Sequence, residues 1–129
     1  MIGIVTVGTN DMPRARRFYD ALMPLLGASL DEARSTDDRA WYMIDASAPR
    51  LAVTKPFDGR PATVGNGTMI ALAASGPDNV AAVHARALEL GAADEGAPGY
   101  RSPNPGDPYR AYFRDLDGNK FMVYVPPLS

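Results

Sequence analysis

The first half of the chain alternates short apolar runs with one helical pattern. Residues 2–8, IGIVTVG, are apolar and β-branched, which is typical of a strand. In the segment PRARRFYDALMPLLG, apolar side chains recur at helical spacing, after the start signals Asp11 and Pro13 and before the stop signals Pro24 and Gly27. Three strand-like pieces separated by turn residues follow, at residues 29–34, 40–45 and 51–55. This half therefore predicts the order βαβββ.

The second half repeats that order. GTMIALAA reads as a strand, Pro77 and Asp78 are helix-start signals, and NVAAVHARALELG is an amphipathic helix that ends at Gly91. Three more strands are expected at residues 92–95, 109–114 and 120–125. The predicted fold class is therefore α+β. It consists of two βαβββ modules, at about residues 1–56 and 66–129, within one domain that covers residues 1–129.

Composition narrows the class of protein. A chain of 129 residues with 46% hydrophobic and 22% charged residues suits one ordinary globular domain with a sizeable core. The absence of cysteine excludes thiolate catalysis, disulfides and thiolate metal sites. A formal charge of -2 provides no basic field for nucleic acid. No apolar run reaches the roughly 18 residues of a membrane span, and the N-terminus does not resemble a leader. We therefore expect a cytoplasmic protein with no nucleic-acid or membrane partner.

Three segments carry a resemblance to a known family. YFRDLDGNKFMVY, VGTNDMPRARRFYDALMPLLGA and TKPFDGRPATVGNGTMIAL together resemble the vicinal oxygen chelate superfamily of glyoxalases, bleomycin-resistance proteins and ring-cleaving dioxygenases. The RDLDGNK hairpin is close to the family's Asp-Pro-Asp-Gly-Asn motif. The resemblance covers nearly the whole chain. It implies curled sheets that form an incomplete barrel around a central cleft, and commonly a homodimer.

The same resemblance marks where a metal would bind. In metal-dependent members, His, Gln and Glu ligands project from the first and last strand of each module. The matching positions here are Ile4, Ala52, Met69 and Met122, none of which can hold a hard or borderline divalent cation. Catalytic transition-metal sites also need about three ligands from His, Cys, Asp and Glu, whereas this chain has one His and no Cys. We therefore expect no metal and no cofactor, although an all-carboxylate site for Mg²⁺ or Ca²⁺ is conceivable.

The solitary histidine is not expected to be catalytic. His84 falls beside the apolar stripe of the second helix, so it is either a helix-surface residue or a satisfied structural one. Its place on the helix disfavours a Ser-His-Asp set in the cleft. No catalytic residue is identified from the sequence.

Alternation along the strands indicates what lines the predicted cleft. Residues two apart share a face, so Met122 lies with Tyr124, Ile4 with Thr6, and Met69 with Ala71. Only one of the neighbours Trp41 and Tyr42 can face inward, and only one of Tyr109 and Tyr112. The predicted ligand-binding residues are Ile4, Thr6, Trp41, Ala52, Lys55, Phe57, Met69, Ala71, Tyr100, Tyr109, Tyr112, Met122 and Tyr124.

Two loops are candidates for the rim of that cleft. In TKPFDGR, Lys55 or Arg60 could meet an anionic ligand, or the segment is a solvated linker held by Pro56. GAPGYRSPNPGDPYR is long and rich in Pro and Gly, as expected of a mobile flap, with Tyr100 and Arg101 as ligand contacts.

These features predict a metal-independent protein that binds a small organic molecule in an apolar, aromatic-edged cleft. Two alternatives stay open. One is a glyoxalase-like lyase or isomerase, either metal-free, using Tyr with Lys or Arg, or with a metal site not recognised here. The other is a structural or interaction module whose cleft is filled by its own side chains.

Overall fold

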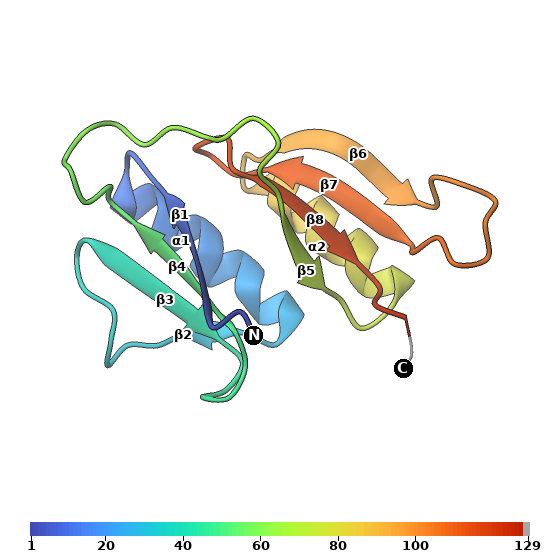
Figure 1. Cartoon of the computed structure of the whole chain (residues 1–129), viewed down its shortest axis with the longest axis horizontal. Helices are drawn as coiled ribbons and strands as arrows, with labels where there is room; N and C mark the ends of the chain where they lie inside the picture. Colours follow the sequence, from blue (N-terminus) through green and yellow to red (C-terminus); the bar gives the residue numbers. More distant parts are fainter. Residues whose placement is uncertain (128–129) are drawn as a thin grey trace. The chain divides into compact units, whose positions relative to one another are not determined.

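Two four-stranded sheets, each accompanied by one long helix, make up the chain (Figure 1). The structure, a computed structural model, describes residues 1–127. The chain divides into two compact units, one spanning Met1–Gly65 and one that starts at Asn66; they are called module 1 and module 2 below. Among the described residues, no helix has the length and apolar character needed to cross a membrane.

Module 1 follows the order predicted for the first half. Its elements are β1 (Ile4–Gly8), α1 (Met12–Leu22), the 3-10 helix η1 (Met23–Leu26), β2 (Ser29–Leu30), β3 (Arg39–Met43) and β4 (Arg50–Thr54). The strands lie in the order β1-β4-β3-β2, with β1 parallel to β4 and the other pairs antiparallel. The helix supplies the crossover connection that a parallel pair requires.

The ends of α1 follow from its sequence. The Asp11 carboxylate accepts a hydrogen bond from the Arg14 N–H at 3.0 Å and caps the first turn, which contains Pro13. Pro24 has no N–H to donate, and the chain passes into η1 before Gly27 ends it with a φ of 77°. The single predicted helix is therefore two consecutive helical segments.

The core of module 1 lies between α1 and one face of the sheet. Ala15, Phe18, Tyr19 and Leu22 form the buried stripe of the helix. Tyr19 packs against Tyr42 of β3, with 5.8 Å between the ring centres. The strand residues buried on this face are Val7, Ala40, Tyr42, Leu51 and Val53.

Module 2 has the same plan. Its elements are β5 (Ile70–Ala73), α2 (Pro77–Glu89), β6 (Ala93–Gly99), β7 (Arg110–Arg114) and β8 (Lys120–Tyr124), and the strands lie in the order β5-β8-β7-β6. Val80, Val83 and Ala87 of α2 are fully buried. On the facing strands Phe113 stacks on Phe121 at 5.5 Å between ring centres. Gly91, with a φ of 103°, follows the helix as predicted.

The predicted α+β class and its two βαβββ modules are confirmed, whereas several strand boundaries differ, two of them by four residues. The strand expected at 29–34 stops at Leu30, because Asp31 turns the chain by accepting hydrogen bonds from the N–H groups of Arg34 and Ser35. The strand expected at 92–95 continues to Gly99 through register shifts next to Gly96. The incomplete barrel with its central cleft concerns how the modules combine and stays a prediction.

Candidate functional site

Each module has a sheet face that its own helix does not cover, here called its open face. In module 1, Trp41 pairs with Ala52, which in turn pairs with Thr6, so the three lie in one row across the strands. The neighbours of Trp41 in β3, Ala40 and Tyr42, are buried on the helix side. Trp41 therefore lies on the open face, and Tyr42 belongs to the core.

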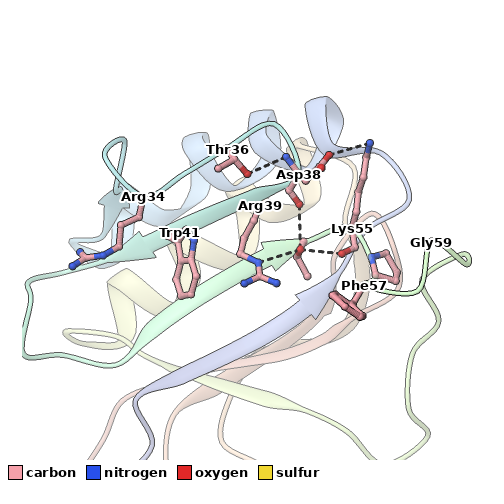
Figure 2. Close-up of a pocket in the computed structure, with 10 residues that line it drawn as sticks. Arg34, Thr36, Asp38, Arg39, Trp41, Lys55, Phe57 and Gly59 are labelled. Carbon is pink, nitrogen blue, oxygen red and sulfur yellow. Dashed lines mark hydrogen bonds and ion pairs between the residues drawn. The ribbon is translucent and has the colours of Figure 1, made fainter.

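A cavity of about 570 Å³ opens at the β3–β4 end of this face (Figure 2). Its lining comes from β3, β4 and the segments next to them: Arg34, Thr36, Asp38, Arg39, Trp41, Thr54, Lys55, Pro56, Phe57 and Gly59. The predicted residues Trp41, Lys55 and Phe57 thus come together here. Ile4, Thr6 and Ala52 lie on the same open face but do not line the cavity.

Two of the three cations in the cavity wall already have counter-ions. The Lys55 Nζ lies 3.2 Å from the Asp38 Oδ1, and the Arg34 guanidinium lies 3.0 Å from the Asp31 carboxylate. The hydrogen bond from Arg34 holds the pKa of Asp31 below its usual value, so the carboxylate stays charged. Each of these two positive charges therefore has a carboxylate partner within the protein.

The third cation, Arg39, contacts a hydroxyl group and an aromatic ring instead of a carboxylate. Its Nε donates to the Thr54 Oγ1 at 3.2 Å, and its guanidinium carbon lies 5.6 Å from the centre of the Trp41 ring. Within residues 1–127, it forms no ion pair with a carboxylate. Figure 2 shows Arg39 beside Trp41, while Lys55 points the other way, toward Asp38. A neutral oxygen and an aromatic ring hold Arg39, so its charge remains available to a ligand.

Sequence reasoning missed Arg39 although a signal existed. Arg39 is two residues before Trp41 in the same strand and therefore shares its face. Strand alternation could not place Arg34 in the same way, because Arg34 lies in the turn after Asp31 and outside any strand.

In module 2 the predicted residues divide between two places. Tyr112 pairs with Met122, which pairs with Ala71, so these three form a row on the open face of module 2. Tyr109 precedes β7 and packs edge-to-face on Tyr100, with 5.3 Å between ring centres. Tyr100, Tyr109 and Tyr124 line a cavity of about 370 Å³. Met69 is exposed directly before β5.

His84 is a structural residue and not a helix-surface one. Its side chain is buried, and its Nε2 lies 3.0 Å from the Asp94 Oδ1 at the start of β6. The N–H of Gly96 and then the His84 ring lower the pKa of Asp94. This contact joins α2 to β6 and places the histidine in the core of module 2.

The residues present do not fit the metal of the metal-dependent relatives. Of the four matching positions, Ile4 and Ala52 offer only hydrocarbon, and Met69 and Met122 offer thioethers, which suit soft ions and not hard or borderline divalent ones. Among residues 1–127, no group of three or more His, Cys, Asp or Glu side chains is placed to hold a metal ion. No metal-dependent step can therefore be derived from these side chains.

Comparisons with known proteins agree with this architecture. A family model described as a glyoxalase-like domain matches residues 4–124. The chain is 36% identical to a glyoxalase/bleomycin resistance protein from Albidiferax ferrireducens T118, with a TM-score of 0.87 and coverage of 98% of this chain and 99% of that one. No curated protein matches the chain.

Two more distant structures share the fold alone. A glyoxalase-related enzyme from Fulvimarina pelagi is 17% identical, with a TM-score of 0.74 and coverage of 100% of this chain and 92% of that one. A fosfomycin resistance protein from Listeria monocytogenes is 16% identical, with a TM-score of 0.67 and the same coverage.

Proposed function

Because the chain belongs to the glyoxalase-like domain family, we propose that it uses this scaffold, without a metal ion, to bind a small organic anion on the open face of module 1. The anionic group of the ligand accepts hydrogen bonds from the Arg39 guanidinium. The apolar or planar part of the ligand lies against Trp41 and the exposed ring of Phe57.

The observation that carries this proposal is the uncompensated guanidinium of Arg39, held beside Trp41 in the wall of a cavity. Arginine binds carboxylate and phosphate groups through two parallel hydrogen bonds, and a flanking aromatic ring limits its motion. The volume of about 570 Å³ falls within the roughly 300 to 1,000 Å³ typical of small-molecule sites.

The proposal dispenses with a metal because the matching strand positions carry no donors that suit a hard or borderline divalent ion. A carboxylate buried without a metal would be costly, whereas Ala52, which is buried and pairs with Trp41, carries no charge. Binding is favoured over acid–base catalysis, because Asp38, the carboxylate in the cavity wall, is engaged by Lys55.

The single tryptophan provides the test. Trp41 is the chain's one Trp, so a change in its fluorescence reports ligand at this cavity. Benzoate and biphenylcarboxylate, each paired with its uncharged amide, are titrated against the wild-type chain and Arg39→Gln. We expect the carboxylates to bind more tightly than the amides, and Arg39→Gln to weaken them by about tenfold or more.

Arg34→Gln is the matched control. It removes the same charge from the same cavity wall, but Arg34 is paired with Asp31, so carboxylate affinity should change little. Equal affinity for acids and amides, or an Arg39→Gln chain that binds like the wild type, would count against the proposal.

A further inference from the structure

A cavity of about 370 Å³ lies at one end of module 2 and is not used by the function proposed for module 1. Its wall combines the first residue of α2, the loop between β6 and β7, and the segment after β8, which lie at the same end of module 2 (Figure 1). Tyr112, Met122 and Ala71, the row on the open face, do not line it. We propose that this cavity is a binding site for a small quaternary ammonium cation.

Three tyrosine rings line the cavity. Tyr100 and Tyr109 pack edge-to-face, with 5.3 Å between ring centres and 80° between ring planes, so they form a nearly perpendicular corner. The third ring, Tyr124, is on the strand beside Tyr109, where the Val125 N–H donates to the Tyr109 carbonyl oxygen at 3.0 Å. The face of an aromatic ring attracts cations, and groups of such rings recognise quaternary ammonium ligands. The wall therefore has the aromatic surface that such a cation needs.

The charges of the wall do not suit an anion. Among the described residues that line the cavity, Asp107 is the one that carries a charge. Arg110 is the first residue of β7, the place that Arg39 has in β3. The Arg110 guanidinium, however, lies 2.8 Å from the Asp107 carboxylate. The arginine that is available to a ligand in module 1 is therefore compensated at the equivalent place in module 2.

The remaining wall favours a quaternary cation over a primary one. Asp107 already accepts hydrogen bonds from the N–H groups of Arg101 and Ser102 and from the Arg110 guanidinium, which leaves little acceptor capacity for the N–H groups of a primary ammonium. A quaternary ammonium has no N–H, and its methyl groups can rest on the proline and tyrosine rings. The prolines of the wall are Pro77, Pro105, Pro108, Pro126 and Pro127.

The aromatic corner is held in place by the chain itself. Tyr100 directly precedes Arg101, whose N–H donates to the Asp107 carboxylate at 2.7 Å, and its ring rests on Tyr109. The fixed φ of each proline restricts the backbone of the wall. A wall that is ordered before the ligand arrives lowers the entropic cost of binding.

The test compares choline with ethanolamine and with 3,3-dimethylbutan-1-ol, in which carbon replaces the charged nitrogen of choline. The backbone amides of Gly106 and Tyr109 are followed by ¹⁵N NMR, and the indole N–H of Trp41 reports on module 1. We expect choline to give saturable shifts in module 2 and none at Trp41. Its affinity should exceed that of either comparison compound by about fivefold or more.

Substitutions of the rings locate the site. Tyr100→Leu and Tyr124→Leu each keep apolar surface but remove a ring face, and each should weaken choline binding by about fivefold. Tyr100→Phe and Tyr124→Phe keep the ring and should retain most of the affinity. Tyr112→Leu removes a tyrosine ring outside the wall and is the control, which should leave choline affinity unchanged. Tyr100 is 64% exposed, so its substitution leaves the core intact, and thermal melts check the fold of every variant.

Several outcomes would overturn the inference. Equal affinity for choline and the uncharged alcohol would remove the role of charge, and equal affinity for ethanolamine would remove the preference for a quaternary cation. Folded Leu variants that bind choline like the wild type would show that the rings do not hold it. Absence of saturable shifts in module 2, or shifts confined to Trp41, would mean that this cavity is not the site.

Discussion

At the scale of single residues, Tyr42 shows how one side chain of an adjacent aromatic pair is committed to the core. Its hydroxyl donates to the Asp20 carboxylate at 2.8 Å, and the ring is buried against α1. Burial, reinforced by Asp20, raises the pKa of Tyr42 far above its ordinary value of 10.0. The proton therefore stays on the folded protein at pH values where an unfolded tyrosine loses it.

This arrangement predicts a pH dependence that Tyr42→Phe removes. A raised pKa stabilises the fold fully below 10.0, and this contribution is lost as the pH rises toward the folded-state pKa. Urea unfolding of the wild type should therefore show stability that falls more steeply above pH 10.0 than in the variant. At neutral pH the variant should lose about 1 kcal/mol with its hydrogen bond, because exposed Asp20 can regain water. Parallel curves for the two proteins at high pH would contradict this reading.

Single residues also show the limit of sequence reasoning about the site. Alternation left open which of Trp41 and Tyr42, and which of Tyr109 and Tyr112, faces the ligand. The strand register places Trp41 and Tyr112 on the open faces of their sheets, because each pairs with the matching last-strand position. Whether a cation is compensated depends on contacts across a turn or between strands, so the difference between Arg34 and Arg39 is not visible in the sequence.

At the scale of elements, the segment between β6 and β7 is organised by one carboxylate. The Asp107 side chain accepts from the N–H groups of Arg101 and Ser102 at 2.7 and 2.9 Å, and from the Arg110 guanidinium at 2.8 Å. These donors, with the Arg101 N–H first, hold the pKa of Asp107 below its ordinary value of 3.8. The loop expected to be a mobile flap thus has a charged internal anchor.

Asp107→Asn should therefore loosen this loop at neutral pH. In the wild type, the stabilisation is present above 3.8 and is lost as the pH falls through the lower folded-state pKa. Amide signals of Arg101 and Ser102 should titrate with a midpoint below 3.8, and in the variant they should be flat and exchange faster with solvent. Asp58→Asn, in the exposed loop after β4, serves as a control that should leave both amides unchanged. A midpoint at or above 3.8 in the wild type would argue against the anchor.

Elements were predicted well where local chemistry decides them. The caps of α1 and the glycine after α2 lie where the sequence places them. The length of β6 could not be predicted, because its continuation past Gly96 depends on pairing with β7, which lies distant in sequence. The strand expected at 29–34 is ended by a local contact instead, because the side chain of Asp31 accepts a hydrogen bond from the Arg34 N–H and turns the chain.

At the scale of the whole molecule, the internal repeat is what made the fold predictable. Two weakly similar halves each give βαβββ, and the register repeats as well: Ala52 and Met122 hold equivalent places in β4 and β8. The resemblance also predicts a homodimer, which sedimentation equilibrium of the purified chain measures directly. The way the modules combine is not encoded in any local pattern, so the predicted cleft needs a test of its own.

Restoring the missing donors provides that test. If the two modules form the predicted incomplete barrel, the first and last strands of each module must bring four positions to one point. The variant Ile4→His, Ala52→Glu, Met69→His and Met122→Glu should then bind about one Zn²⁺ per chain by calorimetry, because it supplies the three or four ligands that such a site needs. Met69→His with Met122→Glu offers only two donors and should bind weakly or not at all. If the fourfold variant folds but does not bind Zn²⁺, the four positions do not converge. Stoichiometric metal in the wild-type protein would instead overturn the metal-independent function proposed for module 1.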